Sequence, residues 1–432
     1  MLRGRPRLRF APAPTGLPHL GTARTALYNW LYARHCGGEM LLRIEDTNTE
    51  LATADHVSEI FEMLDWLGLD FDGEPIYQSR RNDLYDAAVE RWLDEGRAYH
   101  DEGAVRFSVP DEGVTAFDDV VRGRVEFPNA AIEDFVVRRS DGRATFFVAN
   151  AVDDLDLGIT HVVRGEDLLN TTPKVVLLRA ALGSADVPAF AHLPLIVNSQ
   201  RRKLSKRRDD VSLTSYRDRG VLPSAMANYL ALLGWGPPDG IEVRPLAEIV
   251  ELFDLADVNA AAAMFDMDKL TAMNGEYLRA LDDAGFAAAI EPWVSAESWG
   301  VDVDQESLSA VAPLIRERTR VLSDAPDRIA FLFCEPEIDP DDWRKTTAPP
   351  AAQILDAAVA AFAEVPWTAD ALHALLREIG ETFSLKLGKA QAPVRVAVTG
   401  RAVGPPLFES LALLGRDATL ARLRAARDRL GD

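Results

Sequence analysis

The chain has 432 residues, of which 47% are hydrophobic, and a formal net charge of -21 at neutral pH. This length is enough for about two to four domains, each with its own core. An excess of negative charge argues against non-specific nucleic-acid binding by the whole surface. It does not exclude RNA as a partner, because phosphate contact requires only a local basic patch. No run of about 20 apolar residues occurs, so we expect no membrane span.

The cysteines and the N-terminus both favour a reduced, cytoplasmic environment. Cys36 and Cys334 lie far apart and show no CxxC spacing, so neither a disulfide scaffold nor a zinc site is expected. The N-terminus is basic, but no apolar segment follows it, and a signal peptide is therefore not expected.

The N-terminal part is predicted to alternate strands and helices. Apolar runs at 8–11 and 40–44 flank a helix predicted over Leu20–His35, which Gly37-Gly38 ends. A strand–helix–strand unit with short joints implies a parallel sheet with a right-handed crossover. Apolar residues at helical spacing predict a further helix near 57–67.

Between about 97 and 141 the pattern changes to short strands, with Asp141-Gly142 as a hairpin turn, and we predict a small mixed insertion. The α/β pattern then resumes. It predicts a strand at 159–163, a helix capped by Asn170, and a strand at 193–197.

Beyond Ser212 the chain is predicted to be mainly helical, with Pro or Gly at the joints. The acidic, proline-rich stretch 336–350 is predicted to link two helical regions.

The segment Pro18-His19-Leu20-Gly21-Thr22 opens the first predicted helix. Backbone N–H groups and the positive end of the dipole at such a position bind anions, including phosphates. His19 is suited to donate to phosphate oxygens as charge develops on a leaving pyrophosphate, and Gly21 allows a nucleotide to approach closely. The alternative interpretation is an ordinary helix start.

A second segment, Lys203-Leu204-Ser205-Lys206-Arg207, lies in a run of basic residues. Cations on such a loop are suited to neutralise the transition state of a phosphate-transferring reaction. The alternative is a solvated basic loop.

The two segments, in this order, resemble the ATP-binding signatures of class I aminoacyl-tRNA synthetases. Flanking blocks narrow the resemblance to bacterial-type glutamyl-tRNA synthetases. Arg9-Phe-Ala-Pro-Ala-Pro-Thr-Gly, for example, is similar to that family's R-[IF]-A-P-S-P-T-G. The other blocks that carry the resemblance are 24–34, 42–47, 148–154, 164–167, 191–196, 265–277, 395–401 and 404–410.

The resemblance implies a fold of class α/β: a Rossmann-type parallel-sheet catalytic domain with a small mixed α+β insertion, followed by an all-α anticodon-binding region. The implied division is a catalytic core in two halves (1–85 and 144–200), an acceptor-stem-binding insertion (86–143), a helical stem-contact domain with the lysine loop (201–275), and two anticodon-binding helical subdomains (276–345 and 346–432). The insertion is shorter than the family's usual one, because Asp101 is followed almost directly by the strand at Arg106.

The implied activity is that of a glutamate–tRNA ligase. Its substrates are ATP, accompanied by Mg²⁺, L-glutamate and tRNA(Glu), and the tRNA must be bound before the adenylate forms efficiently. We expect no zinc, no membrane partner, a monomer, and a cytoplasmic location.

The resemblance also assigns residues. Catalytic roles fall to His19, Lys203 and Lys206. ATP binding is assigned to His19, Gly21, Asp167, Lys203, Ser205 and Lys206. Glutamate binding is assigned to Arg9, Ala13, Glu45, Phe146, Asn150 and Arg164. Anticodon contact is assigned to Arg316 and Arg318. For the arginines, exposed side chains or surface ion pairs are the alternative.

Three residues depart from the family's pattern. Ala13 stands where Ser is usual, Phe146 where Tyr is usual, and Leu168 where His or Trp is usual. Each change removes a polar group near the expected amino-acid pocket. A divergent paralogue with altered amino-acid or tRNA specificity is therefore an alternative. A non-catalytic tRNA-binding protein is another, against which the intact His19, Lys203 and Lys206 argue.

Overall fold

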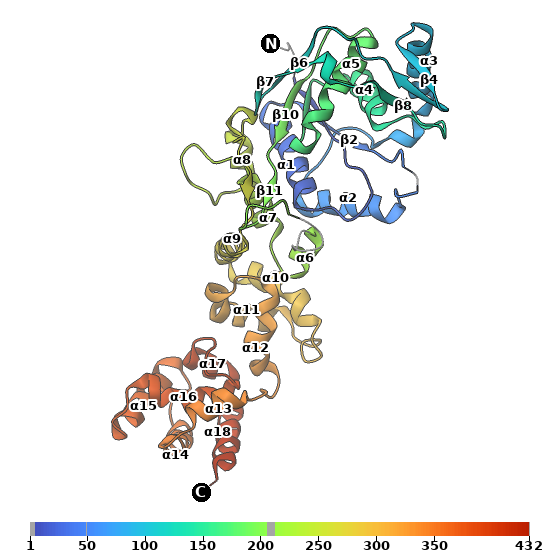
Figure 1. Ribbon diagram of the computed structural model, residues 1–432. Coiled ribbons are helices and arrows are strands. Elements are labelled where there is room, and N and C mark those ends of the chain that lie inside the picture. Colours follow the sequence, from blue (N-terminus) through green and yellow to red (C-terminus); the bar gives the residue numbers. More distant parts are fainter. Residues whose placement is uncertain (1–4, 49, 205–211, 432) are drawn as a thin grey trace. The chain divides into compact units, whose positions relative to one another are not determined.

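The computed structural model describes residues 5–48, 50–204 and 212–431 (Figure 1). The chain forms two compact units. The first comprises Met1–Asp218 with Leu222–Met273, and the second comprises Arg219–Val221 with Asn274–Asp432.

A parallel sheet forms the centre of the first unit. Strand β2 (Glu39–Ile44) pairs in parallel with both β1 (Arg7–Phe10) and β3 (Ile76–Tyr77). Helix α1 (Leu20–His35) connects β1 to β2, as the sequence predicts. Its apolar residues are buried because the helix packs along β1 and β2.

The parallel arrangement continues in the later part of this unit. Strands β9 (His161–Gly165) and β10 (Ala189–Leu193) pair in parallel over five residue pairs. The backbone N–H of Thr160 donates to the carbonyl oxygen of Arg7 at 2.9 Å, so β9 begins beside β1. The carboxyl ends of β1, β9 and β10 therefore lie at the same edge of the sheet. Ligands of parallel sheets bind at this edge.

Part of the predicted insertion joins this sheet. Strands β6 (Val114–Asp119) and β7 (Gly123–Pro128) form an antiparallel hairpin, and β6 pairs in parallel with β10 through Asp119 and Phe190. The sheet order is β7-β6-β10-β9, so the hairpin extends the strands beside the expected site.

The remainder of the insertion forms a separate layer. Strands β4 (Ala98–Asp101), β5 (Ala104–Phe107) and β8 (Phe135–Arg138) make an antiparallel sheet. Its apolar face shares a core with helices α3 (Asn82–Asp94), α4 (Phe146–Asp156) and α5 (Thr172–Ala181).

Three local predictions are wrong. Asn170 does not cap α5, which begins at Thr172 with Pro173 in its first turn. The strand expected over 193–197 is two strands, because Pro194, which has no N–H to donate, separates β10 from β11 (Ile196–Val197). The expected linker 336–350 contains helix α13 (Pro340–Thr346), whose first N–H groups are capped by the carboxylate of Asp339.

Beyond β11 the first unit contains a short strand and mostly helices. These elements are α6 (Leu213–Asp218), α7 (Pro223–Ala231), α8 (Leu246–Leu252), β12 (Ala263–Met264) and the beginning of α9 (Met267–Ala280). Helix α2 (Ala54–Leu67) belongs to the earlier part of the unit, where it connects β2 to β3. Strand β12 pairs in parallel with β11.

The described part of the second unit is helical, so the predicted parallel sheet and the predicted helical second region are both confirmed. Its helices are α10 (Asp283–Ser295), α11 (Gln305–Ile315), α12 (Ala325–Phe333), α13, α14 (Ala351–Phe362), α15 (Ala369–Thr382), α16 (Leu387–Thr399), α17 (Leu407–Leu414) and α18 (Arg416–Leu430). The buried Arg422 of α18 donates to the carbonyl oxygens of Phe331, Cys334 and Val398, and so ties α18 to α12 and α16.

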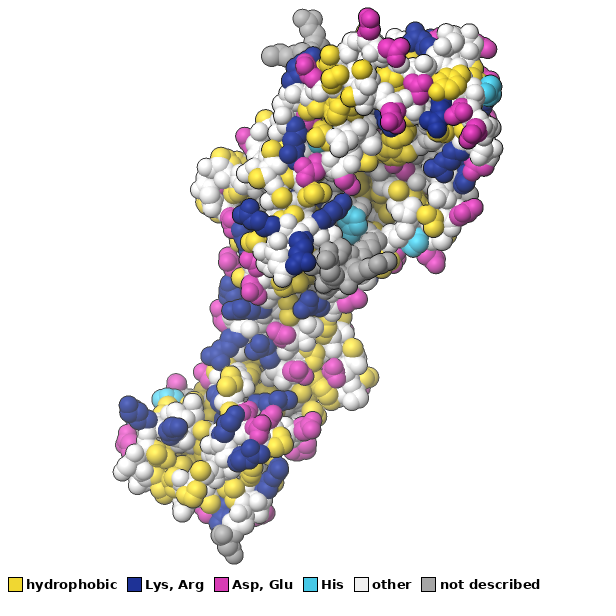
Figure 2. Space-filling view, viewed as in Figure 1, with side chains coloured by type: hydrophobic (Ala, Val, Ile, Leu, Met, Phe, Trp, Pro, Cys, Tyr) yellow, Lys and Arg dark blue, Asp and Glu magenta, His cyan; other side chains and the backbone are white. Residues whose placement is uncertain are grey.

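No helix in the described ranges has both the length and the apolar composition needed to cross a bilayer. Figure 2 shows Lys and Arg side chains among acidic ones on the face drawn. Basic side chains are therefore present on this face although the net charge of the chain is negative.

Candidate active site

A cavity of about 530 Å³ opens in the first unit where β1, β9 and β10 end and α1 begins. Most of the site residues predicted from the sequence lie on its wall. They are Ala13, His19, Gly21, Glu45, Phe146, Arg164, Asp167 and Lys203. Ser205 and Lys206 lie outside the described residues, and Arg9 and Asn150 lie behind the wall, in contact with its supporting residues.

His19 is the residue that caps the N-terminus of α1. Its Nδ1 accepts a hydrogen bond from the backbone N–H of Thr22 at 3.1 Å. A neutral imidazole that accepts at Nδ1 carries its proton on Nε2, which makes Nε2 a donor. A Cβ at Gly21 would lie 3.1 Å from the His19 ring, so a larger residue there would disturb the position of the ring.

Lys203 and Asp167 face each other across the mouth of the cavity. The Nζ of Lys203 lies 3.7 Å from Oδ2 of Asp167, and both side chains are more than half exposed. An exposed pair at this distance contributes little stability. Either side chain is therefore able to exchange its partner for a phosphate or another polar group of a ligand.

A buried network of charges fixes Glu45. Arg43, whose side chain is fully buried, donates to Oε1 of Glu45 at 3.0 Å and to Oδ1 of Asn150 at 2.8 Å. The amide nitrogen of Asn150 also donates to Glu45, at 3.1 Å. One carboxylate on the cavity wall is thus held by two groups from behind.

Asp154 is the centre of this network. Its Oδ1 accepts from Nε of Arg9 at 3.0 Å and from Nη1 of Arg43 at 2.5 Å. Burial alone would raise the pKa of Asp154, but the two guanidinium groups outweigh it and lower that pKa to about 2. Burial also opposes the charge of Arg43, yet Asp154 and Glu45 raise its pKa above the usual value.

Among Arg9, Arg43 and Arg164, only Arg164 has no carboxylate partner in the described part of the chain. It is 6% exposed, and no carboxylate of the described residues lies within ion-pair distance of its guanidinium. Its Nη2 donates to Oγ1 of Thr172 at 2.7 Å and its Nε to Nε2 of His192 at 3.3 Å. Burial, aided by repulsion from Arg9, lowers the pKa of Arg164 to about 10. Neither Arg9 nor Arg164 is an exposed surface residue, so that alternative is wrong.

The three departures from the family pattern lie together. Ala13, Phe146 and Leu168 all line the cavity, and each presents an apolar side chain. The wall therefore combines fixed charges with an apolar surface.

Several supporting residues were missed by the sequence analysis. Four residues hold the wall residues without having been assigned a role: Arg43, Asp154, Thr172 and His192. Of these, only Thr172 lies outside the blocks that resemble the family. A buried pair such as Asp153-Asp154 in an otherwise apolar helix was the available signal for Asp154.

The two predicted anticodon residues lie in the second unit. Arg316 is largely buried and donates to Oδ1 of Asp283 at 2.6 Å and to the carbonyl oxygen of Leu281 at 2.9 Å. Arg318 is exposed and donates to the carbonyl oxygen of Gly404 at 3.0 Å.

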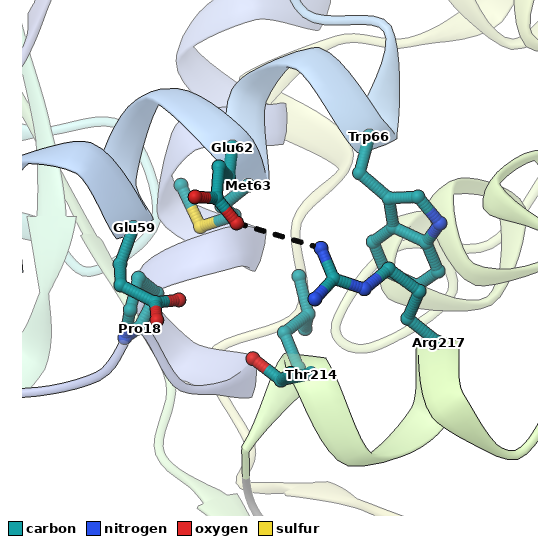
Figure 3. A pocket seen from close by; sticks show the side chains of 8 residues that line it. Pro18, Glu59, Glu62, Met63, Trp66, Thr214 and Arg217 are labelled. Carbon is teal, nitrogen blue, oxygen red and sulfur yellow. Dashed lines mark ion pairs between the residues drawn. The ribbon is translucent and has the colours of Figure 1, made fainter.

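Metal-binding groups and a second cavity can be described for residues 5–48, 50–204 and 212–431. These residues contain no group of three or more His, Cys, Asp or Glu side chains that would hold a metal ion. A small cavity between α2 and α6 is shown in Figure 3, where Glu62 pairs with Arg217 at 3.6 Å beside Trp66. At about 20 Å³ it has room for no more than a water molecule.

Comparison with known proteins agrees with this arrangement. Residues 6–104 and 101–272 match the family model of the catalytic domain of class I tRNA synthetases (E and Q). Residues 285–427 match the family model of an anticodon binding domain. Two relatives named glutamate–tRNA ligase come from Frankia casuarinae, at 49% identity, and Salinispora tropica, at 45%; the alignments cover 98–99% of this chain and 99–100% of theirs.

A solved structure is also similar. The crystal structure of a glutamate tRNA ligase from Elizabethkingia meningosepticum, in complex with its amino acid, matches with a TM-score of 0.88 at 29% identity. The match covers 99% of this chain and 100% of that one.

The fold, the cavity and the matched models define the class: a class I tRNA synthetase, an ATP-using enzyme with an anticodon-binding domain. Within that class, the chain belongs to the family of bacterial-type glutamate–tRNA ligases.

Proposed function

We propose that the cavity at the ends of β1, β9 and β10 binds L-glutamate and ATP and joins them. A carboxylate oxygen of glutamate attacks the α-phosphate, the bond from that phosphorus to the bridging oxygen of the β-phosphate breaks, and pyrophosphate leaves. The glutamyl group then passes from the adenylate to the terminal ribose hydroxyl of tRNA(Glu). The observation that carries this proposal is Arg164, a buried cation on the cavity wall without a protein carboxylate.

Glutamate carries two carboxylates and one amine, and the wall offers groups of opposite charge for them. Arg164 and Arg9 are the proposed partners of the carboxylates, because guanidinium groups are suited to hydrogen-bond carboxylates. Arg9 lies behind the wall with its Nε bound to Asp154, so its Nη groups are the proposed donors to the substrate. Glu45 is the proposed partner of the amine. Its position is fixed by Arg43 and Asn150, so it binds the amine without first being ordered.

ATP is proposed to lie along the start of α1. The Nε2–H of His19 is a donor for phosphate oxygens, and Lys203, which also lines the cavity, supplies positive charge. Lys206 and Ser205 are proposed to act with Lys203, although they lie outside the described residues. Mg²⁺ is proposed to accompany ATP and neutralise phosphate charge. Asp167, an exposed carboxylate on the cavity wall, would supply hard oxygen donors for it.

The remaining predictions are proposals of the same kind. Arg316 and Arg318 are proposed to contact the anticodon, and the predicted insertion, 86–143, the acceptor stem. A shortened insertion is also proposed; the alignment with the Frankia relative runs over 464 positions, so that relative has residues that this chain of 432 residues lacks. The six-part domain division, the tRNA-before-adenylate order, a monomer, and a cytoplasmic location are also proposed.

The proposal is tested by measuring charging of tRNA(Glu) together with pyrophosphate exchange. Exchange should depend on glutamate among the twenty amino acids, and should increase when tRNA(Glu) is present. Exchange that follows another amino acid would instead show that Ala13, Phe146 and Leu168 have rebuilt the pocket for a different substrate.

A further inference from the structure

Behind the cavity, a buried aspartate and a buried histidine lie in contact with each other. Asp119 ends β6 and His192 lies on β10, and both side chains are fully buried. Oδ2 of Asp119 accepts from the backbone N–H of His192 at 3.0 Å and lies 2.5 Å from its Nδ1. A carboxylate only accepts hydrogen bonds, so Nδ1 carries a proton. Burial lowers the pKa of His192, which favours the neutral ring with a bare Nε2.

The bare Nε2 of His192 faces Arg164. It lies 3.3 Å from Nε of Arg164 and 2.9 Å from Oγ1 of Thr172, which itself accepts from Nη2 of Arg164 at 2.7 Å. These contacts hold one edge of the guanidinium from behind. Arg164 also lines the cavity, so the remaining nitrogen of its guanidinium is the group proposed to contact a ligand there.

Both oxygens of Asp119 are in use. While Oδ2 binds His192, Oδ1 accepts from the backbone N–H groups of Val121 and Arg122 in the hairpin turn, at 3.0 and 2.8 Å. An asparagine has only one acceptor oxygen. It would therefore either lose the turn or present an N–H group to His192 and force the opposite tautomer.

The same hairpin reaches the other side of Arg164. Arg122 forms an ion pair with Glu166, two residues after Arg164, and Oε1 of Glu166 accepts from the backbone N–H of Leu195 at 2.8 Å. The hairpin thus contacts the segment that carries Arg164 and, through Glu166, is linked to Leu195 on the cavity wall.

We infer that Asp119 and His192 are positioning residues for Arg164: the aspartate fixes the tautomer of the histidine, and the histidine fixes the guanidinium that receives a substrate carboxylate. This inference rests on the proposed role of Arg164 in binding glutamate. It gives the β6–β7 hairpin a part in amino-acid binding in addition to its proposed contact with tRNA.

The test uses the full chain and measures the Kd for L-glutamate by calorimetry, the KM for ATP, and the thermal unfolding midpoint. His192→Asn removes the acceptor that faces Arg164, whereas His192→Gln retains an amide oxygen near the position of Nε2. Asp119→Asn disturbs the tautomer. Asp118→Asn is the matched control, because its side chain is exposed and pairs only with Arg124 among the described residues.

We expect His192→Asn and Asp119→Asn to weaken glutamate binding by about tenfold, with the KM for ATP unchanged. His192→Gln should recover most of the affinity, and Asp118→Asn should bind as the unmodified chain does. If both histidine variants fail to fold, Asp119→Asn decides the question.

Two results would overturn the inference. One is that His192→Asn and Asp119→Asn bind glutamate as tightly as the unmodified chain does. The other is that these variants lose affinity for ATP and for glutamate equally. Arg164→Lys separates this failure from that of the proposed function. If Arg164→Lys weakens glutamate binding and His192→Asn does not, only the positioning role is lost. If Arg164→Lys has no effect, the proposed carboxylate site itself is wrong.

Discussion

Arg9 donates from Nε to Oδ1 of Asp154 across 3.0 Å, and both side chains are only 3% exposed. The same oxygen accepts from Arg43 at 2.5 Å. One aspartate on α4 thus joins β1 and β2, the two strands that supply Arg9 and lead into Glu45. The geometry of the proposed glutamate site therefore depends on a residue that is not on the cavity wall.

Replacing Asp154 by Ala is expected to destabilise the first unit by about 3–5 kcal/mol, because two arginines would remain buried without their shared carboxylate. The measurement is denaturant unfolding of the full chain. Asp156→Ala, on the same helix, removes an exposed carboxylate paired with Arg81 and should cost less than about 1 kcal/mol. Equal effects of the two substitutions would show that the buried network is not held by Asp154.

The contribution of Asp154 should also depend on pH. Its pKa is lowered from 3.8 to about 2 in the folded chain, so its stabilising effect is complete well above pH 3.8 and declines as the pH falls toward 2. Between pH 6 and pH 3, the difference in unfolding free energy between the unmodified chain and Asp154→Asn should shrink by about 1 kcal/mol. A difference that stays constant over this range would contradict the lowered pKa.

The parts of the fold that follow local rules were predictable. Helix α1 runs over the predicted range Leu20–His35, because its residues alternate at helical spacing between a strand and a Gly-Gly end. Strand β2 likewise lies where the apolar run at 40–44 is found. The break between β10 and β11 was not predicted, because the apolar run continues across Pro194. The proline was the available signal for this break, since it cannot donate a hydrogen bond within a sheet.

The contacts behind the site were not predictable in the same way. Asp119 and His192 are 73 residues apart, and only the pairing of β6 with β10 brings them together. Nothing in the local sequence of the hairpin shows that its last strand residue faces a histidine. Residues such as Arg164 were found from their sequence blocks, whereas the groups that hold them depend on long-range pairing.

Phe146→Tyr should lower the KM for glutamate several-fold. Phe146 lies on the cavity wall, and a hydroxyl there would restore a hydrogen-bonding group worth roughly 1 kcal/mol to substrate binding. The neighbouring Phe147→Tyr is the control, because Phe147 packs against the core beneath the insertion. A KM that rises in Phe146→Tyr would indicate that the apolar wall is adapted to the present substrate.

Arg316 and Arg318 should behave differently when each is replaced by Ala. Arg318 is exposed, so its loss should raise the KM for tRNA(Glu) by about tenfold and leave the unfolding midpoint unchanged. Arg316 is held by Asp283 and Leu281, so its loss should lower the unfolding midpoint in addition to raising the KM for tRNA(Glu). Charging assays over a range of tRNA concentrations, combined with thermal unfolding, distinguish the two. An unchanged KM for tRNA in Arg318→Ala would remove the proposed anticodon contact.

Lys203→Ala should slow adenylate formation by about a hundredfold or more, because a cation that meets charge developing in the transition state is worth several kcal/mol there. The unfolding midpoint should not change, since the only ion pair of Lys203 among the described residues is the exposed 3.7 Å contact with Asp167.

Lys269→Ala is the matched control for this effect. It removes an exposed lysine of the same unit, paired with Glu242 at 2.8 Å and away from the cavity wall, and its exchange rate should equal that of the unmodified chain. Single-turnover measurement of adenylate formation separates the chemical step from ATP binding. Because the charge of Lys203 is proposed to act on the transition state, the loss should appear in the rate at saturating ATP and much less in the KM for ATP. A loss confined to the KM would mean that Lys203 only holds the nucleotide before the reaction.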